Sequence, residues 1–333
     1  MPVLLVALAV ANSLAAPAES KALLENPRSL VRKATLAVEN DAAEPLRAPW
    51  QAQLERDSGD RAALLGLATL ARLTYDYPAA ETLYRRLLGG SDGARPDRFT
   101  VYAHLGLAWA LEERGFSNHA EAQFKEARAA ARLLRDGAAE AEALIALSFV
   151  GARVSGVAAG LDMLERAGRL LPKDALDLEA ERLRHRAVLL GAAGSPQAMA
   201  DAEAGIGLAR RASDLRAEAQ ALRSAAKVMN FRGQNASAVA IYRQAEELFR
   251  KAHDRSWLAV TLTDRAGTHL EHGDLGEATD ALREGLAEAE ASHNLFVIAG
   301  VHNGLADIAM HVNDLPSATD HLNQSVAMYE AQG

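Results

Sequence analysis

The chain has 333 residues, of which 49% are hydrophobic and 24% are charged. This length exceeds the usual single domain of about 100 to 200 residues, so we expect two domains or one extended array. The composition excludes disorder over most of the length. The lack of cysteine excludes disulfides, iron–sulfur clusters, thiol catalysis and cysteine-ligated zinc. A net charge of −8 argues against nucleic acid as a partner, because its phosphate backbone is bound by basic surfaces.

The N-terminus carries an unbroken apolar run at residues 3–10, followed by small residues that end in Ala16-Pro17-Ala18. This A-x-A pattern predicts a secretory signal peptide over residues 1–18 and export to the periplasm or beyond. No basic residue precedes the run, so an apolar helix packed on the first repeat, in a cytoplasmic protein, is the alternative. No stable membrane span is expected, because a spanning helix needs about 20 apolar residues.

An internal repeat dominates the rest of the chain. Small residues recur at intervals of 38 or 40 residues, and the position four residues later is mostly large and apolar. The position three further on is mostly small. The three series are Ala80, Ala120, Gly160, Ala200, Ala238, Ala278, Ala318; Tyr84, Phe124, Leu164, Ala204, Tyr242, Leu282, Leu322; and Leu87, Ala127, Ala167, Gly207, Ala245, Gly285, Ser325. Such i, i+4, i+7 spacing marks one face of a helix, and a fixed period of this length predicts a repeat array.

A second amphipathic segment precedes each of these helices. Its small positions are Ala68, Ala108, Ser148, Val188, Ala226, Ala266 and Ala306, and a turn rich in Gly, Asn, Asp and Ser separates the two segments. Gly and Asn tolerate the positive φ that ends a helix, and Asp or Ser can cap the next one. The sequence therefore predicts an all-α protein of about seven helical hairpins, over residues 59–333.

The pattern resembles the tetratricopeptide repeat, in its 40-residue bacterial variety. Units six and seven carry the motif best, with Leu262, Ala266, Gly273, Asp274, Ala278, Leu282 and with Leu305, Ala306, Asn313, Asp314, Ala318, Leu322. The resemblance implies a right-handed superhelical solenoid. In units one and two a second register exists at Leu65-Gly66 and Leu105-Gly106, so two assignments of the inward-facing side chains stay open there.

The two ends of the array differ from its repeats. Residues 19–58 contain helical stretches at 30–39 and 43–56, which we expect to cap the first repeat. A solenoid also needs a polar cap at its far end, and none follows unit seven. We therefore expect an array that is truncated or continues further, or one that self-associates through its last repeat.

Catalytic motifs are weak in this sequence. Residues 89–93 match the G-x-S-x-G nucleophile elbow, but a predicted helix stands where that motif needs a strand, so we expect a linker. Six of ten histidines lie in the last 80 residues, where 13 acidic residues face 3 basic ones. His269 and His272 with Glu271 and Asp307 could bind a divalent metal, but no metal-binding motif supports this over solvated side chains. We expect no catalytic residue, no metal and no cofactor.

In tetratricopeptide arrays the first helix of each hairpin lines the concave face and contacts ligands. The resemblance implies one apolar and one basic section of ligand-binding residues, namely Tyr102, Leu105, Trp109, Phe149 and then Arg182, His185, Arg223, Lys227, Asn230. This pattern suits a peptide or helix with apolar anchors and carboxylates, hence an acidic partner. The alternative is that the aromatic residues are core and the basic ones only solubilise a helix.

We therefore predict a non-catalytic scaffold that binds a peptide or partner protein in the concave groove. The alternative is the N-terminal sensory or regulatory region of a longer bacterial protein with a caspase-like peptidase, cyclase or kinase domain. A hydrolase that uses the histidine-rich end is the weakest of the three hypotheses.

Overall fold

The computed structural model describes residues 26–90 and 95–330, and the described chain is helical, with no strand. Two helices, α3 (Pro27–Glu39) and α4 (Ala43–Arg56), occupy the two stretches expected to be helical before the repeats. Seven antiparallel hairpins follow: α5 (Arg61–Leu73) with α6 (Tyr77–Gly89), α7 (Arg98–Glu113) with α8 (Ser117–Leu134), α9 (Gly137–Ser155) with α10 (Val157–Leu170), α11 (Leu176–Ala192) with α12 (Ala198–Arg211), α13 (Leu215–Phe231) with α14 (Asn235–Lys251), α15 (Arg255–His272) with α16 (Leu275–Ala291), and α17 (Leu295–His311) with α18 (Leu315–Glu330). The all-α solenoid is confirmed, and residues 1–18 lie outside the described residues.

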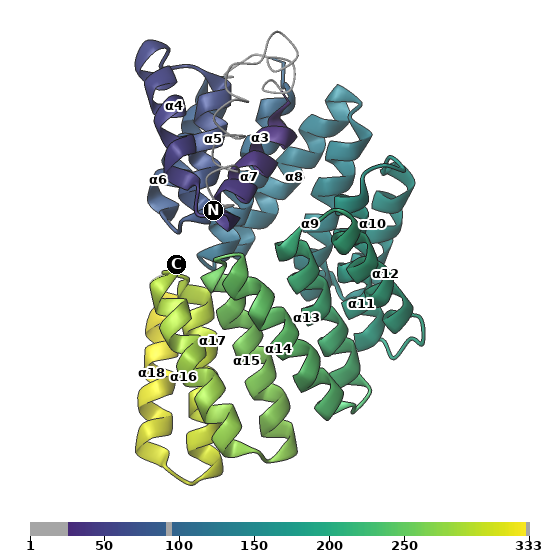
Figure 1. Ribbon diagram of the computed structural model, residues 1–333, viewed down its shortest axis with the longest axis vertical. Coiled ribbons are helices and arrows are strands. Elements are labelled where there is room, and N and C mark those ends of the chain that lie inside the picture. Colours follow the sequence, from purple (N-terminus) through teal and green to yellow (C-terminus); the bar gives the residue numbers. More distant parts are fainter. Residues whose placement is uncertain (1–25, 91–94, 331–333) are drawn as a thin grey trace, which may run out of the picture.

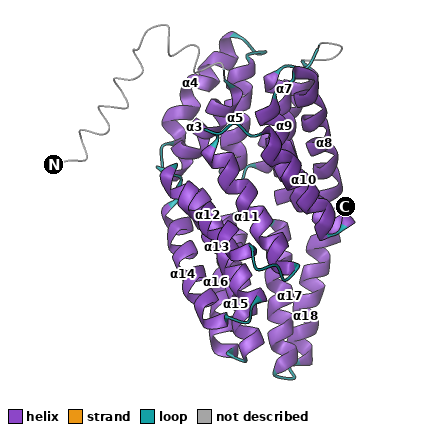
Figure 2. Ribbon diagram, turned by 90° about the vertical axis from the view of Figure 1, so that its right-hand side faces the viewer, coloured by secondary structure: helices purple, strands orange, loops and turns teal. Residues whose placement is uncertain are grey.

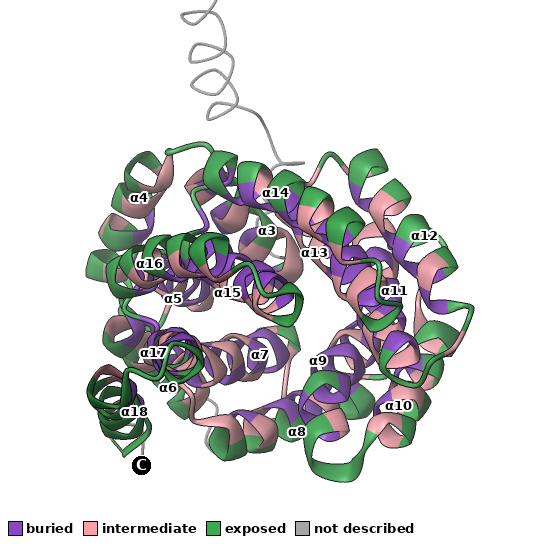
Figure 3. Ribbon diagram, turned by 90° about the horizontal axis from the view of Figure 1, so that it is seen from below, coloured by how far each residue is buried: buried purple, intermediate pink, exposed green. Residues whose placement is uncertain are grey.

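The hairpins stack in chain order and curve into a superhelix (Figures 1 and 2). Viewed along its axis, α7, α9, α11, α13 and α15 form an inner layer, while α8, α10, α12 and α14 lie outside them (Figure 3). Each first helix packs on its own hairpin partner, and the second helix of each of the first six hairpins packs on the first helix of the next. No described helix is long and apolar enough to cross a membrane.

Local backbone chemistry places each turn. One residue with positive φ lies in every hairpin turn: Tyr75, Gly115, Gly156, Gly194, Gly233, Gly273 and Asn313. Six of the seven first helices begin at an Asp or Asn whose side chain accepts a hydrogen bond from the third backbone N–H of the helix, namely Asp60, Asp97, Asp136, Asp214, Asp254 and Asn294. These caps satisfy backbone donors that a helix start would otherwise leave unpaired.

The small residues at the helix crossings are buried, with one exception that corrects the predicted register. In unit four, Ala200, Ala204 and Gly207 are exposed, whereas Ala198, Ala202 and Gly205 are buried at the crossing. The shift arises before α12, where the spacing is shorter by two residues: Ala198 follows Gly160 by 38 residues, whereas the other buried small residues of the second helices are 40 apart. The 38-residue interval therefore lies between units three and four.

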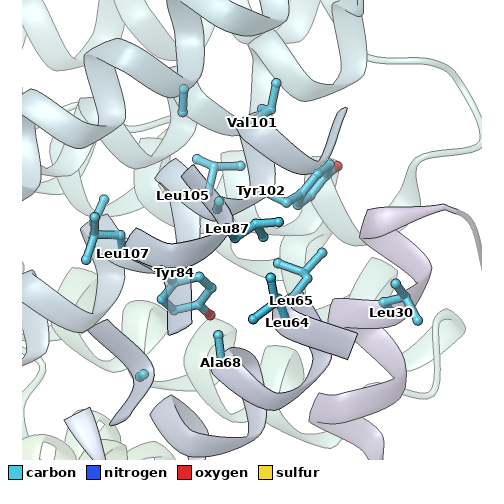
Figure 4. Close-up of a cluster of buried hydrophobic side chains, with 14 of the residues drawn as sticks. Leu30, Leu64, Leu65, Ala68, Tyr84, Leu87, Val101, Tyr102, Leu105 and Leu107 are labelled. Atoms are coloured by element: carbon cyan, nitrogen blue, oxygen red, sulfur yellow. The ribbon is translucent and has the colours of Figure 1, made fainter. Parts of the chain in front are cut away.

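The Leu-Gly register of units one and two also has a structural role. At Gly106 an added Cβ would lie 2.3 Å from the Tyr84 ring, and at Gly66 it would lie 2.7 Å from the Trp50 ring. Glycine at these positions lets an aromatic ring of a preceding helix lie against the backbone. Figure 4 shows Tyr84 among the buried side chains of this core, with Leu30 of α3 beside Leu64 and Leu65.

The superhelix closes on itself at the sixth hairpin. The Tyr75 hydroxyl, in the first hairpin turn, accepts a hydrogen bond of 3.3 Å from the backbone N–H of Ser256 at the start of α15. Tyr75 has φ 66°, a conformation that is strained for a bulky residue. Side chains from hairpins one, two, five and six therefore meet inside the superhelix.

Candidate ligand-binding inner face

Ionisable side chains of the first helices meet on the inside of the superhelix. We define the inner face by those that interact between these helices or with α3: Arg72, Glu113, Glu142, Asp177, Glu181, Arg184, Arg216, Arg223, Lys227 and Asp264. Charged side chains are costly to bury unless they are paired. A concentration of them inside an array built on alanine and leucine contacts therefore indicates a role other than core packing.

One section of this face, on α9 and α11, is acidic. Glu142 accepts a 3.0 Å hydrogen bond from the Tyr102 hydroxyl, and burial raises the pKa of Glu142 to about 7. Asp177 and Glu181 lie nearby on α11. The cation that meets these carboxylates comes from α3, where Arg28 lies 2.5 Å from Asp177 Oδ2 and 3.6 Å from Glu142 Oε2.

The section on α11, α13 and α15 is basic. Asp264 of α15 pairs with two cations of α13, Arg223 at 2.7 Å and Lys227 at 3.1 Å. Burial alone would raise the pKa of Asp264, but Arg223 and Lys227 outweigh it and hold the pKa below its usual value. The Arg223 guanidinium also lies over the Trp257 ring, 5.1 Å from its centroid. One carboxylate shared by two cations leaves a positive charge.

Arg184 adds a third cation to this section. Arg184 is 8% exposed. Its guanidinium lies 3.7 Å from the Glu181 carboxylate, which is beyond hydrogen-bond distance. Among the described residues no group accepts a hydrogen bond from its guanidinium. Burial, together with Arg223 and Arg216, lowers its pKa to about 10 despite Glu181. This buried cation has donors available for an anionic group.

A small cavity lies where the first and sixth hairpins meet. Its volume is about 20 Å³, and its lining includes Glu39, Arg72, Glu113, Arg216 and Asp254. Arg72 lies 2.6 Å from Glu113, and Arg216 lies 2.5 Å from Asp254. The cavity is large enough for one water molecule but not for an organic ligand.

The four residues of the predicted apolar section lie in different environments. Tyr102 is buried at the acidic section, and Leu105 lies in the core cluster around α5 to α9. Trp109 packs edge-on against Phe124 of its own hairpin, with ring centroids 5.1 Å apart, which places it in the hairpin core. Phe149 is exposed under the Arg153 guanidinium.

The predicted basic residues also face different surroundings. Arg223 and Lys227 lie together on the inner face, and Asn230, one turn further, donates to Thr268 Oγ1 of α15. Arg182 instead forms two hydrogen bonds with Glu179 and lies against Gly168 of α10, the second helix of the preceding hairpin.

His185 is buried beside Ser148 and Phe149. Burial and Arg184 lower its pKa well below 6.5, so this histidine is neutral and is not a cation.

Sequence reasoning missed Arg28, Glu142, Asp177, Glu181, Arg184 and Asp264. A usable signal was present, because polar partners on neighbouring first helices are separated by about one repeat. Tyr102 and Glu142 are 40 residues apart, and Lys227 and Asp264 are 37 apart. Arg28 precedes the repeats, so the repeat period does not predict its contact with Asp177, which is 149 residues away.

The histidine-rich end shows no metal-binding cluster within the described residues. His269 lies 3.5 Å from Asp274. His302 and His321 stack with their Nδ1 atoms 3.2 Å apart, and burial together with His321 lowers the pKa of His302.

Among known proteins, no family model and no curated sequence matches this chain. Solved structures do match. A Rap protein complexed with competence and sporulation factor is 13% identical, with a TM-score of 0.67 over 94% of this chain and 98% of the Rap chain. The Rap conjugation gene regulator of plasmid pLS20, in complex with the Phr* peptide, is 16% identical, with a TM-score of 0.55 over 83% and 77%.

A third match is a STAND protein from Pyrococcus horikoshii with a tetratricopeptide repeat sensor. It is 12% identical, with a TM-score of 0.54 over 92% of this chain and 49% of that one. These likenesses concern the fold.

Proposed function

Because the chain folds as a tetratricopeptide-type helical solenoid, we propose that it is a non-catalytic scaffold that binds a peptide or a segment of a partner protein on its inner face. The observation that carries this proposal is Arg184, an 8% exposed arginine near Arg223 whose guanidinium has no hydrogen-bond acceptor among the described residues. A carboxylate of a ligand would supply the missing charge-assisted hydrogen bonds. An acidic side chain or the C-terminal carboxylate of a peptide has this chemistry.

The comparisons support the proposal without fixing the ligand. Two of the matched structures are Rap proteins, one complexed with competence and sporulation factor and one with the Phr* peptide. In the third match a tetratricopeptide repeat array is the sensor of a longer protein. This match supports the alternative hypothesis that the chain is the regulatory region of a longer protein. Both hypotheses use the inner face for recognition, and neither requires catalytic residues.

The test is selection of random peptides displayed on phage against the full chain, followed by affinity measurements on synthetic copies of the enriched peptides. Arg184→Gln and Lys227→Gln should each weaken binding by about 10-fold or more, since a charge-assisted hydrogen bond contributes about 1.5 to 3 kcal/mol. Arg243→Gln is the matched control, because Arg243 is an exposed arginine of the outer helix α14. Thermal unfolding of each variant separates lost binding from lost folding.

Enriched peptides that bind all three variants as well as the unmodified chain would contradict the assignment of the inner face. Failure to enrich any peptide that contains a carboxylate would contradict the ligand class.

A further inference from the structure

Helix α3 does not stack like the helices of the array. It packs mainly on α5 and only weakly on α4, although three residues separate it from α4. Leu30 and Ala34, spaced i and i+4, are buried on one side, whereas Arg32, Lys33 and Leu36 are exposed. Leu30 joins the core beside Leu64 and Leu65 of α5 (Figure 4). An apolar stripe at this spacing is how an amphipathic helix docks onto an apolar surface.

Polar contacts at the first turn of α3 reach further into the superhelix. Arg28 meets Asp177 of α11 and Glu142 of α9, which also accepts from Tyr102. Arg28 is the cation that meets Glu142 and Asp177, while Arg184 of the basic section lies 3.7 Å from Glu181. The side chain of Arg28 therefore occupies a site whose shape and charge suit a basic residue.

The last turn of α3 lies at the other side of the superhelix. Glu39 is buried at the small cavity, near Arg216 and Asp254, and no group of the described residues donates to its Oε1. Arg32 donates to the carbonyl of Ala212, in the turn before α13, at 3.4 Å. Thus α3 bridges the first hairpin to the third, fourth and fifth through polar contacts. Because partly exposed ion pairs contribute little net stability, these contacts add little to the free energy that holds α3 in place.

The adjoining helix is anchored separately. Trp50 of α4 lies against the backbone of Gly66 on α5, which holds α4 in place without help from α3. Between them, Asp41 has φ 53°, and residues 40–42 form the whole connection. Because α4 is anchored on its own, a connection this short can act as a hinge about which α3 moves.

We infer that α3 is a displaceable internal ligand, and that the site it occupies, formed by α5 and by Tyr102, Glu142 and Asp177, binds a short amphipathic helix with a basic residue in its first turn. The contact of Arg28 with Glu142 and Asp177, together with the seat of Leu30 on α5, carries the inference. A partner with this pattern would compete with α3. The inference deepens the proposed function, because it assigns the ligand class of the acidic section, next to the basic one.

The experiment uses a fluorescein-labelled peptide of residues 26–40 and the full chain. Leu30→Asp should release α3, and Leu36→Asp is the matched control on the exposed side of the same helix. While α3 occupies the site, the apparent affinity for the peptide is reduced in proportion to the fraction of molecules whose site is empty. We therefore expect Leu30→Asp to bind the peptide about 10-fold tighter than the unmodified chain does. Adding Asp177→Asn to Leu30→Asp should remove this gain.

Hydrogen exchange of residues 27–39 gives a readout that needs no ligand. These amides should exchange faster in Leu30→Asp than in Leu36→Asp, while α13 to α16 stay protected. Arg28→Glu is a second releasing variant, for use if Leu30→Asp does not fold.

Equal peptide binding by both aspartate variants, or equal exchange of residues 27–39 in both, would overturn the inference. Neither outcome depends on the phage selection. If Leu30→Asp releases α3 but the phage selection enriches no peptide, the result would contradict the proposed function and leave this inference intact.

Discussion

The two ends of the solenoid differ in how their apolar surface is covered. At the first hairpin, α3 and α4 cover α5, and one continuous core extends from α3 to α9. At the last hairpin, α18 exposes Leu315, Leu322, Val326 and Tyr329. Leu282 and Leu322 hold the same position in units six and seven, yet Leu282 is 1% exposed and Leu322 is 43% exposed. The next first helix, with Gly304 against Leu282, makes the difference. Burial in a repeat array thus depends on the neighbour as much as on the motif.

The largest expected effect comes from the same substitution at these two positions. Leu282→Ala should lower the free energy of unfolding by about 2 to 5 kcal/mol, because it leaves a cavity in a packed site. Leu322→Ala should cost less than about 1 kcal/mol, since its side chain already meets solvent. Urea unfolding of both variants measures the difference. Equal losses would mean that the last hairpin is covered in solution.

A second comparison concerns the crossings. Ala278→Leu should destabilise by roughly 1 to 3 kcal/mol, because the side chain is fully buried between two helices. Ala200→Leu is the control, since Ala200 is exposed in the structure although the repeat pattern placed it at a crossing. We expect no change in melting temperature for Ala200→Leu, and a loss similar to that of Ala278→Leu would restore the register expected from sequence.

The covered end should lose stability as pH rises. Burial, with Asp214, raises the pKa of Glu39 from 4.5 to about 7. Its contribution is therefore complete below pH 4.5 and is lost as pH rises through about 7. Glu39→Gln removes this ionisation, so it should be more stable than the unmodified chain by about 1 to 2 kcal/mol at pH 8 and equal to it near pH 4.5. A stability difference that does not vary with pH would contradict the assignment.

The open end should respond in the opposite direction, and more weakly. Burial and His321 lower the pKa of His302 below 6.5, so its contribution is present above pH 6.5 and is lost as pH falls through the lowered pKa. Amides of α17 and α18 should exchange faster at pH 5.5 than at pH 7.5, after correction for the intrinsic rate. His321→Gln should reduce this acceleration, and an unchanged acceleration would show that the two imidazoles are not coupled.

Much of the architecture followed from local pattern. The hairpins, their turns and six of seven units in register were predictable, because crossing distances demand small residues at a fixed period and turns demand Gly, Asn or Asp. The register of unit four was wrong because Ala198 follows Gly160 by two residues fewer than in the other repeats, and the period alone does not locate a two-residue shortening.

The candidate site was less accessible to sequence reasoning. Arg223 and Lys227 lie on the inner face, because a first helix has one face directed at its neighbours. Trp109 instead packs within its own hairpin, and Arg182 packs against α10 of the preceding hairpin. Helical spacing fixes which residues share a face, and it leaves undecided which helix that face meets.

The sequence by itself determined the helices, their pairing and the stacking of hairpins, since these depend on contacts between residues less than about one repeat apart. Only the tertiary structure decided which charges meet inside the superhelix. Its curvature brings Tyr75 to Ser256, 181 residues away, and Arg28 to Asp177, 149 away. Curvature accumulates from small rotations between repeats, so no single motif encodes it.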